Sequence, residues 1–242
     1  MIEKRLRAFL EKLIEERRWG GESIAVRART LTPEEAIGSP EDTDYPLIKG
    51  RERLMEAEFR GARGQAFTDM FGNFEGTLEE IVETDLSDNF RRAVFIAALN
   101  AVMRHAGLAE KTVHCRDGEP AECSRELPDC LLKYGPVRRV TLVGLQPRIL
   151  EALAGRFEVR ATDMDEENIG ERRCCVTIEE PEKARGQIEW CDAAVVTGTT
   201  VANGTIEQFI DTGKPTVFFG VTGAGAAAVL GLDRFCPLGR QK

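Results

Sequence analysis

The sequence predicts an α/β protein with two domains: an α+β domain over residues 1–110 and a Rossmann-like domain with a mostly parallel sheet over residues 111–242. Two observations support this prediction. In the second half, short and nearly continuous apolar segments alternate with helical segments, the pattern of a parallel sheet covered by helices on both faces. In the first half, apolar residues recur at helical spacing or alternate with polar ones, and this pattern changes near residue 110.

In the N-terminal half, apolar spacing predicts an amphipathic helix over residues 2–17 and a strand over 23–28. Residues 60–76 are rich in glycine and are predicted to form a long polar loop, which is often a functional feature in a compact domain. Further elements are expected as short strands near 30–37 and 44–50 and as helices over 77–83 and 88–105, the last capped by Asp88 or Asn89 and ended by Gly107.

In the C-terminal half, each predicted strand is followed by a turn and then by a helix. Pro147 suits the first turn of a helix because its missing N–H would be unpaired there. The strands are expected over 140–144, 157–163, 192–197 and 215–220, and the helices over 147–154, 204–210 and 223–230.

Composition restricts the partners. A formal net charge of -8 disfavours nucleic acid, and the arginine pairs are short and flanked by acids. No apolar run is long enough to span a bilayer, and the charged start of the chain is not a signal peptide, so the protein is expected in the cytoplasm. The seven cysteines are then expected to be thiols. A homodimer is compatible with the composition but is not specified by it.

The first strand–helix unit of the C-terminal half has the spacing of a nucleotide-binding turn. Gly144 ends a strand, Gln146 precedes a helix, and Asp163 ends the next strand about 20 residues later, where a ribose-binding acid is found in dinucleotide folds. The three-glycine fingerprint is missing, so NAD is weakly supported, whereas a nucleoside without pyrophosphate remains open. In the alternative interpretation, Asp163 caps a turn and Gly144 only permits one.

Two further loops are candidates for binding a ligand at the same sheet edge. The first offers hydroxyl, amide and backbone groups before a helix, an arrangement suited to anions, although it can equally be a polar capped turn. Its candidate residues are Thr197, Gly198, Thr199, Thr200, Asn203 and Thr205. The second, with Asp163, Asp165 and Asn168, can bind a cation or hydrogen-bond a ligand, or can simply be solvated.

His114, Cys115 and Cys123 are the candidate ligands for a transition metal ion, because thiolates and imidazole suit soft metals. Their spacing is not that of a structural zinc site, and buried inert thiols are the alternative. Lys49 and Asp69 are candidates for proton transfer, provided that the glycine-rich loop reaches the edge of the Rossmann-like sheet. Spacing alone does not establish such a catalytic role.

Taken together, the motifs resemble the heavy-metal chelation family, from about residue 20 to 237. The motifs in question are Asp44-Tyr-Pro-Leu-Ile-Lys-Gly, Gly64-Gln-Ala-Phe-Thr-Asp69, Asn89-Phe-Arg-Arg-Ala93, Leu99-Asn100-Ala101, Thr112-Val-His-Cys115, Gly144-Leu-Gln-Pro147, Asp163-Met-Asp165 through Asn168-Ile-Gly170, Thr197-Gly-Thr-Thr200, Asn203-Gly-Thr205 and Arg234-Phe-Cys-Pro237. The resemblance implies an enolase-N-terminal-like first domain, a Rossmann-like second domain and a site in the cleft between them. It also implies a role in handling heavy metals, which for the family is itself an inference and not an established reaction.

Three functional hypotheses follow. The protein can hold a metal or small anionic ligand in the interdomain cleft through the groups named above. It can be an enzyme acting there on a small anionic or nucleoside-like substrate. In a third reading, the cleft holds an organic ligand that itself carries the metal.

Overall fold

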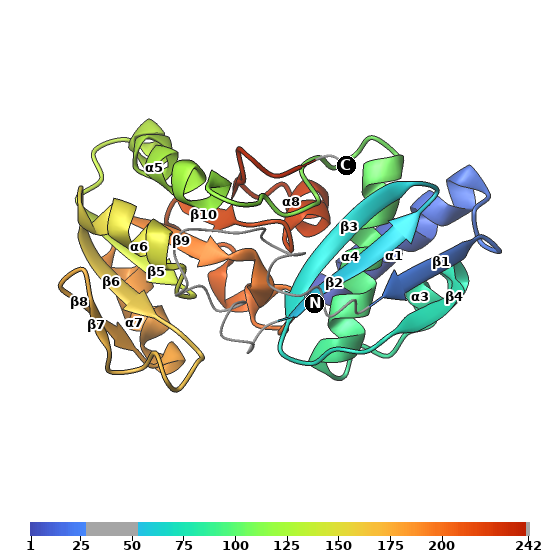
Figure 1. Ribbon diagram of the computed structural model, residues 1–242, viewed down its shortest axis with the longest axis horizontal. Coiled ribbons are helices and arrows are strands. Elements are labelled where there is room, and N and C mark those ends of the chain that lie inside the picture. The colour runs from blue at the N-terminus through green and yellow to red at the C-terminus, as the bar shows by residue number, and fades with distance from the viewer. Residues whose placement is uncertain (28–52, 241–242) are drawn as a thin grey trace.

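The structure is a computed structural model that describes residues 1–27 and 53–240, and its two sheets lie at opposite ends of the molecule (Figure 1). The segments 30–37 and 44–50, for which strands were predicted, lie outside the described residues. Within the described part, no helix is long and apolar enough to cross a membrane.

The first sheet is antiparallel and has the strand order β3-β2-β1-β4. Helix α4 packs along β2 and β3, and helix α1 lies against α3 (Figure 1). Its elements are α1 (Ile2–Arg17), β1 (Ser23–Arg27), β2 (Arg53–Phe59), β3 (Ala62–Thr68), β4 (Phe74–Thr77), α3 (Leu78–Glu83) and α4 (Asn89–His105).

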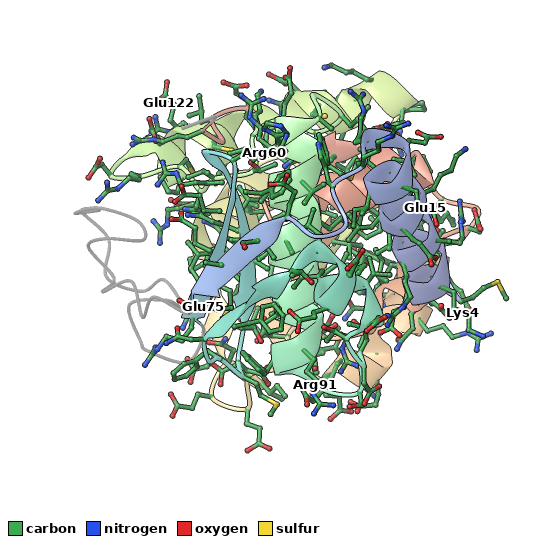
Figure 2. The ribbon with its side chains drawn as sticks, turned by 90° about the vertical axis from the view of Figure 1, so that its right-hand side faces the viewer. Lys4, Glu15, Arg60, Glu75, Arg91 and Glu122 are labelled. Carbon is green, nitrogen blue, oxygen red and sulfur yellow. The ribbon has the colours of Figure 1, made fainter. Side chains whose placement is uncertain are left out.

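The helices of this domain follow the predicted pattern. On α1, Leu6 and Leu10 are buried, while Lys4 and Glu15 point outward, as Figure 2 shows. Helix α4 begins as expected, because the Asp88 side chain accepts a hydrogen bond from the backbone N–H of Arg91 at 2.8 Å. Its residues 93–103 are all buried, so α4 is the central helix of the N-terminal core.

The prediction that residues 60–76 form a glycine-rich loop is wrong, because β3 and β4 occupy most of this segment. Arg60 and Gly61, both at positive φ, form the tight turn between β2 and β3. Gly64 lies inside β3 for another reason: a Cβ there would come within 2.2 Å of the Ala101 backbone nitrogen on α4. The glycine therefore allows close helix–strand packing, which sequence composition does not distinguish from a loop.

The second sheet has the strand order β11-β10-β9-β5-β6-β8-β7, with every neighbouring pair parallel except β7 and β8. When its parallel strands are numbered along the chain, this is the doubly wound order of a Rossmann fold, so the predicted fold class is confirmed. Its elements are α5 (Glu119–Leu131), β5 (Arg139–Val143), α6 (Pro147–Ala154), β6 (Glu158–Thr162), β7 (Arg172–Arg173), β8 (Val176–Glu179), α7 (Ala184–Trp190), β9 (Ala193–Thr197), β10 (Thr216–Phe219), α8 (Ala224–Leu230) and β11 (Arg234–Phe235).

Some elements of this half differ from the expectation. Helix α5 was not predicted, because it contains two prolines and follows the turn-forming pair Asp117-Gly118. The helix expected over residues 204–210 is only a short 3-10 helix, Ile206–Phe209. The domain boundary between residues 110 and 111 stays a prediction.

One buried amide forms hydrogen bonds to elements of both halves of the chain. The Asn100 side chain on α4 is fully buried, and its Nδ2 donates to the backbone oxygens of Gln65 at 2.9 Å, Thr222 at 3.1 Å and Val221 at 3.3 Å. Its Oδ1 accepts from the Gly225 backbone N–H at 2.6 Å. One side chain therefore satisfies backbone groups of β3, of the turn after β10 and of α8, which lies beside β3 in Figure 1.

We predict that Asn100→Leu lowers the free energy of unfolding by about 3 kcal/mol, because several buried backbone groups lose their partner at once. Urea denaturation followed by circular dichroism measures the change. The same substitution at the exposed residue Asn73 is the control and is expected to have little effect. An equal loss in both variants would contradict the role given to Asn100.

Candidate functional site

The candidate site lies at the switch point of the second sheet, where β5 and β9 run side by side and their following chains diverge. Gly144 follows β5 at a φ of +84°, and a Cβ at this position would lie 2.5 Å from Thr197 Cγ2. Any larger residue is therefore excluded at Gly144 by both backbone and space. The loops after β6 and β9 flank this turn, as the parallel order requires.

Asp163 holds the first of these loops to the turn after β5. Its Oδ2 accepts a hydrogen bond from the Leu145 backbone N–H. Its Oδ1 accepts from the Asp165 N–H at 2.8 Å and from Asn168 Nδ2 at 3.3 Å, and Asn168 is buried. The carboxylate is thus engaged by its own loop and by the turn after β5, and a ligand or metal would have to share it.

Two other predicted ligand groups also satisfy backbone donors near their own position. The Gln146 side chain caps α6 by accepting from the Ile149 N–H at 2.5 Å. Asp165 Oδ1 accepts from the Glu167 N–H at 3.0 Å. These bonds set the shape of the two turns, and whether either side chain contacts a ligand stays a prediction.

The loop after β9 brings its predicted hydroxyl groups together. Thr197 Oγ1 lies 3.0 Å from Thr199 Oγ1, and Thr200 Oγ1 donates to the Thr197 carbonyl at 2.8 Å. Gly198 and Thr200 are buried, and Gly198 leaves no room for a side chain because a Cβ would lie 2.7 Å from the Gly223 nitrogen. Asn203 Oδ1 accepts from the Thr205 hydroxyl at 2.7 Å and from the Thr205 N–H at 3.1 Å.

One contact links the two loops across the switch point. Asn203 Nδ2 lies 3.4 Å from the sulfur of Met164, which follows Asp163 and is 60% exposed. Because β5 lies between β6 and β9 in the sheet, this contact crosses the carboxyl end of β5. An amide–thioether contact is weak and exposed, so a ligand can displace it at little cost.

Elements of the N-terminal half approach this edge, and whether a ligand site lies between the halves stays a prediction. Strand β3 contacts the 3-10 helix Gly198–Thr200. From α4, Arg92 donates to the carbonyl oxygen of Ala202 at 3.2 Å and to that of Leu86 at 2.6 Å. The loop after β9 is therefore held between the switch point and α4.

A third glycine-bearing turn, residues 220–225, follows β10 at the edge of the sheet where parallel strands place ligand loops. The structure instead packs it against the first domain: Thr222 is fully buried and its hydroxyl accepts the Phe67 N–H at 3.0 Å. Together with the bonds to Asn100, this contact leaves the turn occupied by protein, so it acts as part of the domain interface.

A separate cavity of about 240 Å³ lies behind the loop after β9, between α1 and α4. Leu6, Phe95 and Ile96 form much of its wall, and Glu3 and Arg92 are among its charged groups. It is smaller than the cavities of about 300 Å³ or more that hold drug-sized ligands.

The residues proposed for proton transfer are only partly placed. Asp69 is exposed just after β3, and its Oδ1 accepts from Asn89 Nδ2 at 2.8 Å. Lys49 lies outside the described residues. A catalytic role for either residue stays a prediction.

His114 is held with one ring nitrogen protonated. Its Nδ1 lies 2.6 Å from the Cys115 carbonyl oxygen, which can only accept, so Nδ1 carries the hydrogen and Nε2 keeps its lone pair. Burial lowers the pKa of His114 to about 4, and the bond to Cys115 opposes this only in part. The ring is thus neutral at pH 7, the form in which imidazole binds metals.

The thiols beside it are protonated rather than poised to bind metal. Burial raises the pKa of Cys115 and raises that of Cys123 to about 12. A third thiol, Cys236, lies close enough to both to raise their pKa values further, and burial raises its own. Among residues 1–27 and 53–240, no group of three or more His, Cys, Asp or Glu side chains is arranged to hold a metal ion.

Sequence reasoning missed Cys236 because it lies far along the chain from the other two cysteines. The pairing of Val113 with Arg240 returns the C-terminal segment to this region. The Cys236 thiol also lies against Gly239, where a Cβ would come within 2.7 Å of the sulfur. No local spacing rule reports such a contact.

We predict that Asp163→Asn loosens the switch point, because an amide cannot accept from all the donors that the carboxylate serves. Hydrogen exchange of residues 144–146 and 163–170 should accelerate, with a stability loss of about 1–3 kcal/mol. Glu166→Gln removes a charge from an exposed position of the same loop and serves as the matched control. Unchanged exchange in Asp163→Asn would show that its bonds do not hold the loop.

The pKa of His114 predicts a loss of stability in acid. Since the folded ring has a pKa of about 4 and the unfolded ring about 6.5, the unfolded state binds more protons between these values. Stability is therefore full above pH 6.5 and falls toward pH 4, by roughly 1–3 kcal/mol from this ring. Denaturation at several pH values should show this slope, reduced in His114→Gln, and a ring that titrates near 6.5 by NMR would refute it.

Two solved structures similar to this chain come from one protein family. A protein of unknown function from Pyrococcus horikoshii, assigned to the family DUF364, has a TM-score of 0.56 and 16% identity over 92% of this chain and 80% of its own. A member of that family from Desulfitobacterium hafniense has a TM-score of 0.49 and 11% identity over 74% of this chain and 72% of its own. A search of the curated proteins finds no match.

At 16% identity, the first likeness shows the fold and nothing about a ligand. The family model, described as "Putative heavy-metal chelation", matches residues 127–232, which run from α5 to the end of the loop after α8 and include the switch point. Over these residues the chain matches the model of this family, in agreement with the resemblance of its motifs.

Proposed function

We propose that this protein handles a metal by binding a small anionic ligand that carries it, at the switch point between β5 and β9. The observation that carries the proposal is the meeting of two polar loops over the carboxyl end of β5, marked by the contact of Asn203 with Met164. Doubly wound sheets bind ligands at this place. The description of the family supplies the expectation of a metal.

The described residues favour a ligand that brings most of the metal's donors with it. His114 is neutral, but the thiols of Cys115 and Cys123 would have to lose protons that burial holds firmly. Direct ligation by these three residues stays the competing form of the same proposal. A metal held mainly by an organic ligand would need from the protein only shape, hydrogen bonds and charge balance.

The loops can supply those contacts. The hydroxyls of Thr197 and Thr199 are partly exposed and bonded to each other, so they can turn to donate to an anionic oxygen. Asp163 is held back by bonds to backbone N–H groups, which reduces its repulsion of an anion. The exposed Met164 offers an apolar surface to the organic part of such a ligand.

The test is native mass spectrometry with elemental analysis of protein purified without chelator or affinity-tag metal. Thr199→Val keeps the shape of the side chain but removes the hydroxyl, and Thr212→Val is the matched control outside the site. Loss of a hydrogen bond to a charged group should weaken retention about tenfold to a hundredfold. We expect a bound mass that Thr199→Val loses and that Cys115→Ser and Thr212→Val keep.

Two outcomes would overturn this form of the proposal. A stoichiometric metal that is lost in Cys115→Ser but kept in Thr199→Val would assign chelation to the thiol cluster. A bare chain that takes up no metal on titration would reject a metal role and leave the enzyme hypothesis ahead.

A further inference from the structure

A pair of adjacent cysteines forms the turn between β7 and β8. Arg173 pairs with Val176, so the connection consists of Cys174 and Cys175 alone. Their φ angles are +50° and +64°, the signs of a type I′ turn, which normally selects Asn-Gly. Both side chains are exposed.

The pair lies apart from the candidate ligand site. Strand β8 runs from Val176, next to the turn, to Glu179, whose carbonyl oxygen accepts the Asp163 N–H at 3.1 Å. The two cysteines are therefore at the opposite end of β8 from the switch point. Figure 1 places β7 and β8 at the end of the second sheet that faces away from the first domain.

We propose that Cys174 and Cys175 are a surface dithiol site that captures trivalent arsenic species. Trivalent arsenic is thiophilic and binds two neighbouring sulfurs at a pyramidal centre, so it needs no third protein ligand. Two thiols on consecutive residues of one tight turn provide a short chelate, and the second bond forms at high effective concentration. The thiol of Cys115 is buried and that of Cys123 is partly buried, so neither offers the same access.

The reaction needs no oxidant. An organoarsenic oxide condenses with the two thiols, the two S–H hydrogens leave with the arsenic-bound oxygen as one water molecule, and two S–As bonds form. Arsenic stays trivalent and both sulfurs keep their oxidation state. Burial and, to a smaller extent, Glu151 raise the pKa of Cys174, and Arg148 opposes this. The net reaction carries both thiol protons away in the water molecule, so a raised pKa slows the attack by the thiolate without changing the products.

Phenylarsine oxide is the probe, added to the reduced full-length protein and followed by native mass spectrometry. We expect one arsenical per chain with the loss of one water, mapped to the peptide that contains residues 174 and 175. A dithiol such as 2,3-dimercaptopropanol should remove it, whereas a monothiol at the same concentration should not. Cys174→Ser and Cys175→Ser should each weaken capture at least about a hundredfold, since each leaves a single S–As bond.

The variant carrying both Cys174→Asn and Cys175→Gly controls for folding, because it installs the residues that a type I′ turn prefers. It should keep the fold, measured by circular dichroism, and lose capture. Cys130→Ser removes a partly buried thiol elsewhere and should bind as the parent does. Capture retained by the double variant, or mapped to Cys115, Cys123 or Cys236, would overturn the proposal. These outcomes are independent of Thr199→Val, so this inference and the proposed function can fail separately.

Discussion

The arrangement of the molecule depends on the buried amide of Asn100. Its donors and acceptor meet backbone groups from β3, the turn after β10 and α8. A buried amide with unpaired groups would be costly, so the bonds require one relative placement of the two sheets. That placement also brings β3 against the loop after β9.

The switch point is built from groups that are already paired with one another. Asp163 accepts hydrogen bonds from backbone N–H groups, and the hydroxyls of Thr197 and Thr199 are bonded to each other. The Asn203 side chain accepts a hydrogen bond from the Thr205 hydroxyl. A ligand that bound here would meet groups that are already ordered, which would lower the entropy cost of binding. Its binding would depend on replacing these short local bonds with equally good ones.

The cysteines show how location changes the chemistry of one residue type. Cys115, Cys123 and Cys236 lie near one another where burial holds their protons, whereas Cys174 and Cys175 stand exposed on a two-residue turn. A count of cysteines suggests metal binding but does not say which thiols an ion can reach. Access and protonation are properties of the folded surroundings.

The sequence by itself determined the elements whose signal is local. Apolar spacing located α1, cap residues located α4, and the strand–turn–helix pattern located β5, α6 and β9, because side-chain periodicity and caps act within a few residues. The candidate loops after β5, β6 and β9 followed from the rule that parallel strands end at one edge.

Only the tertiary structure decided which glycine-bearing segments pack against the rest of the protein and which cysteines lie near one another. The turn at residues 220–225 is rich in glycine, as ligand-binding loops often are, but β3 packs against it. Gly64 belongs to a glycine-rich segment that predicts a loop, but it lies in a strand packed on α4. Cys236 joins Cys115 and Cys123 through a contact across half the chain. These outcomes rest on packing between segments far apart in sequence, and local residue patterns carry no record of such packing.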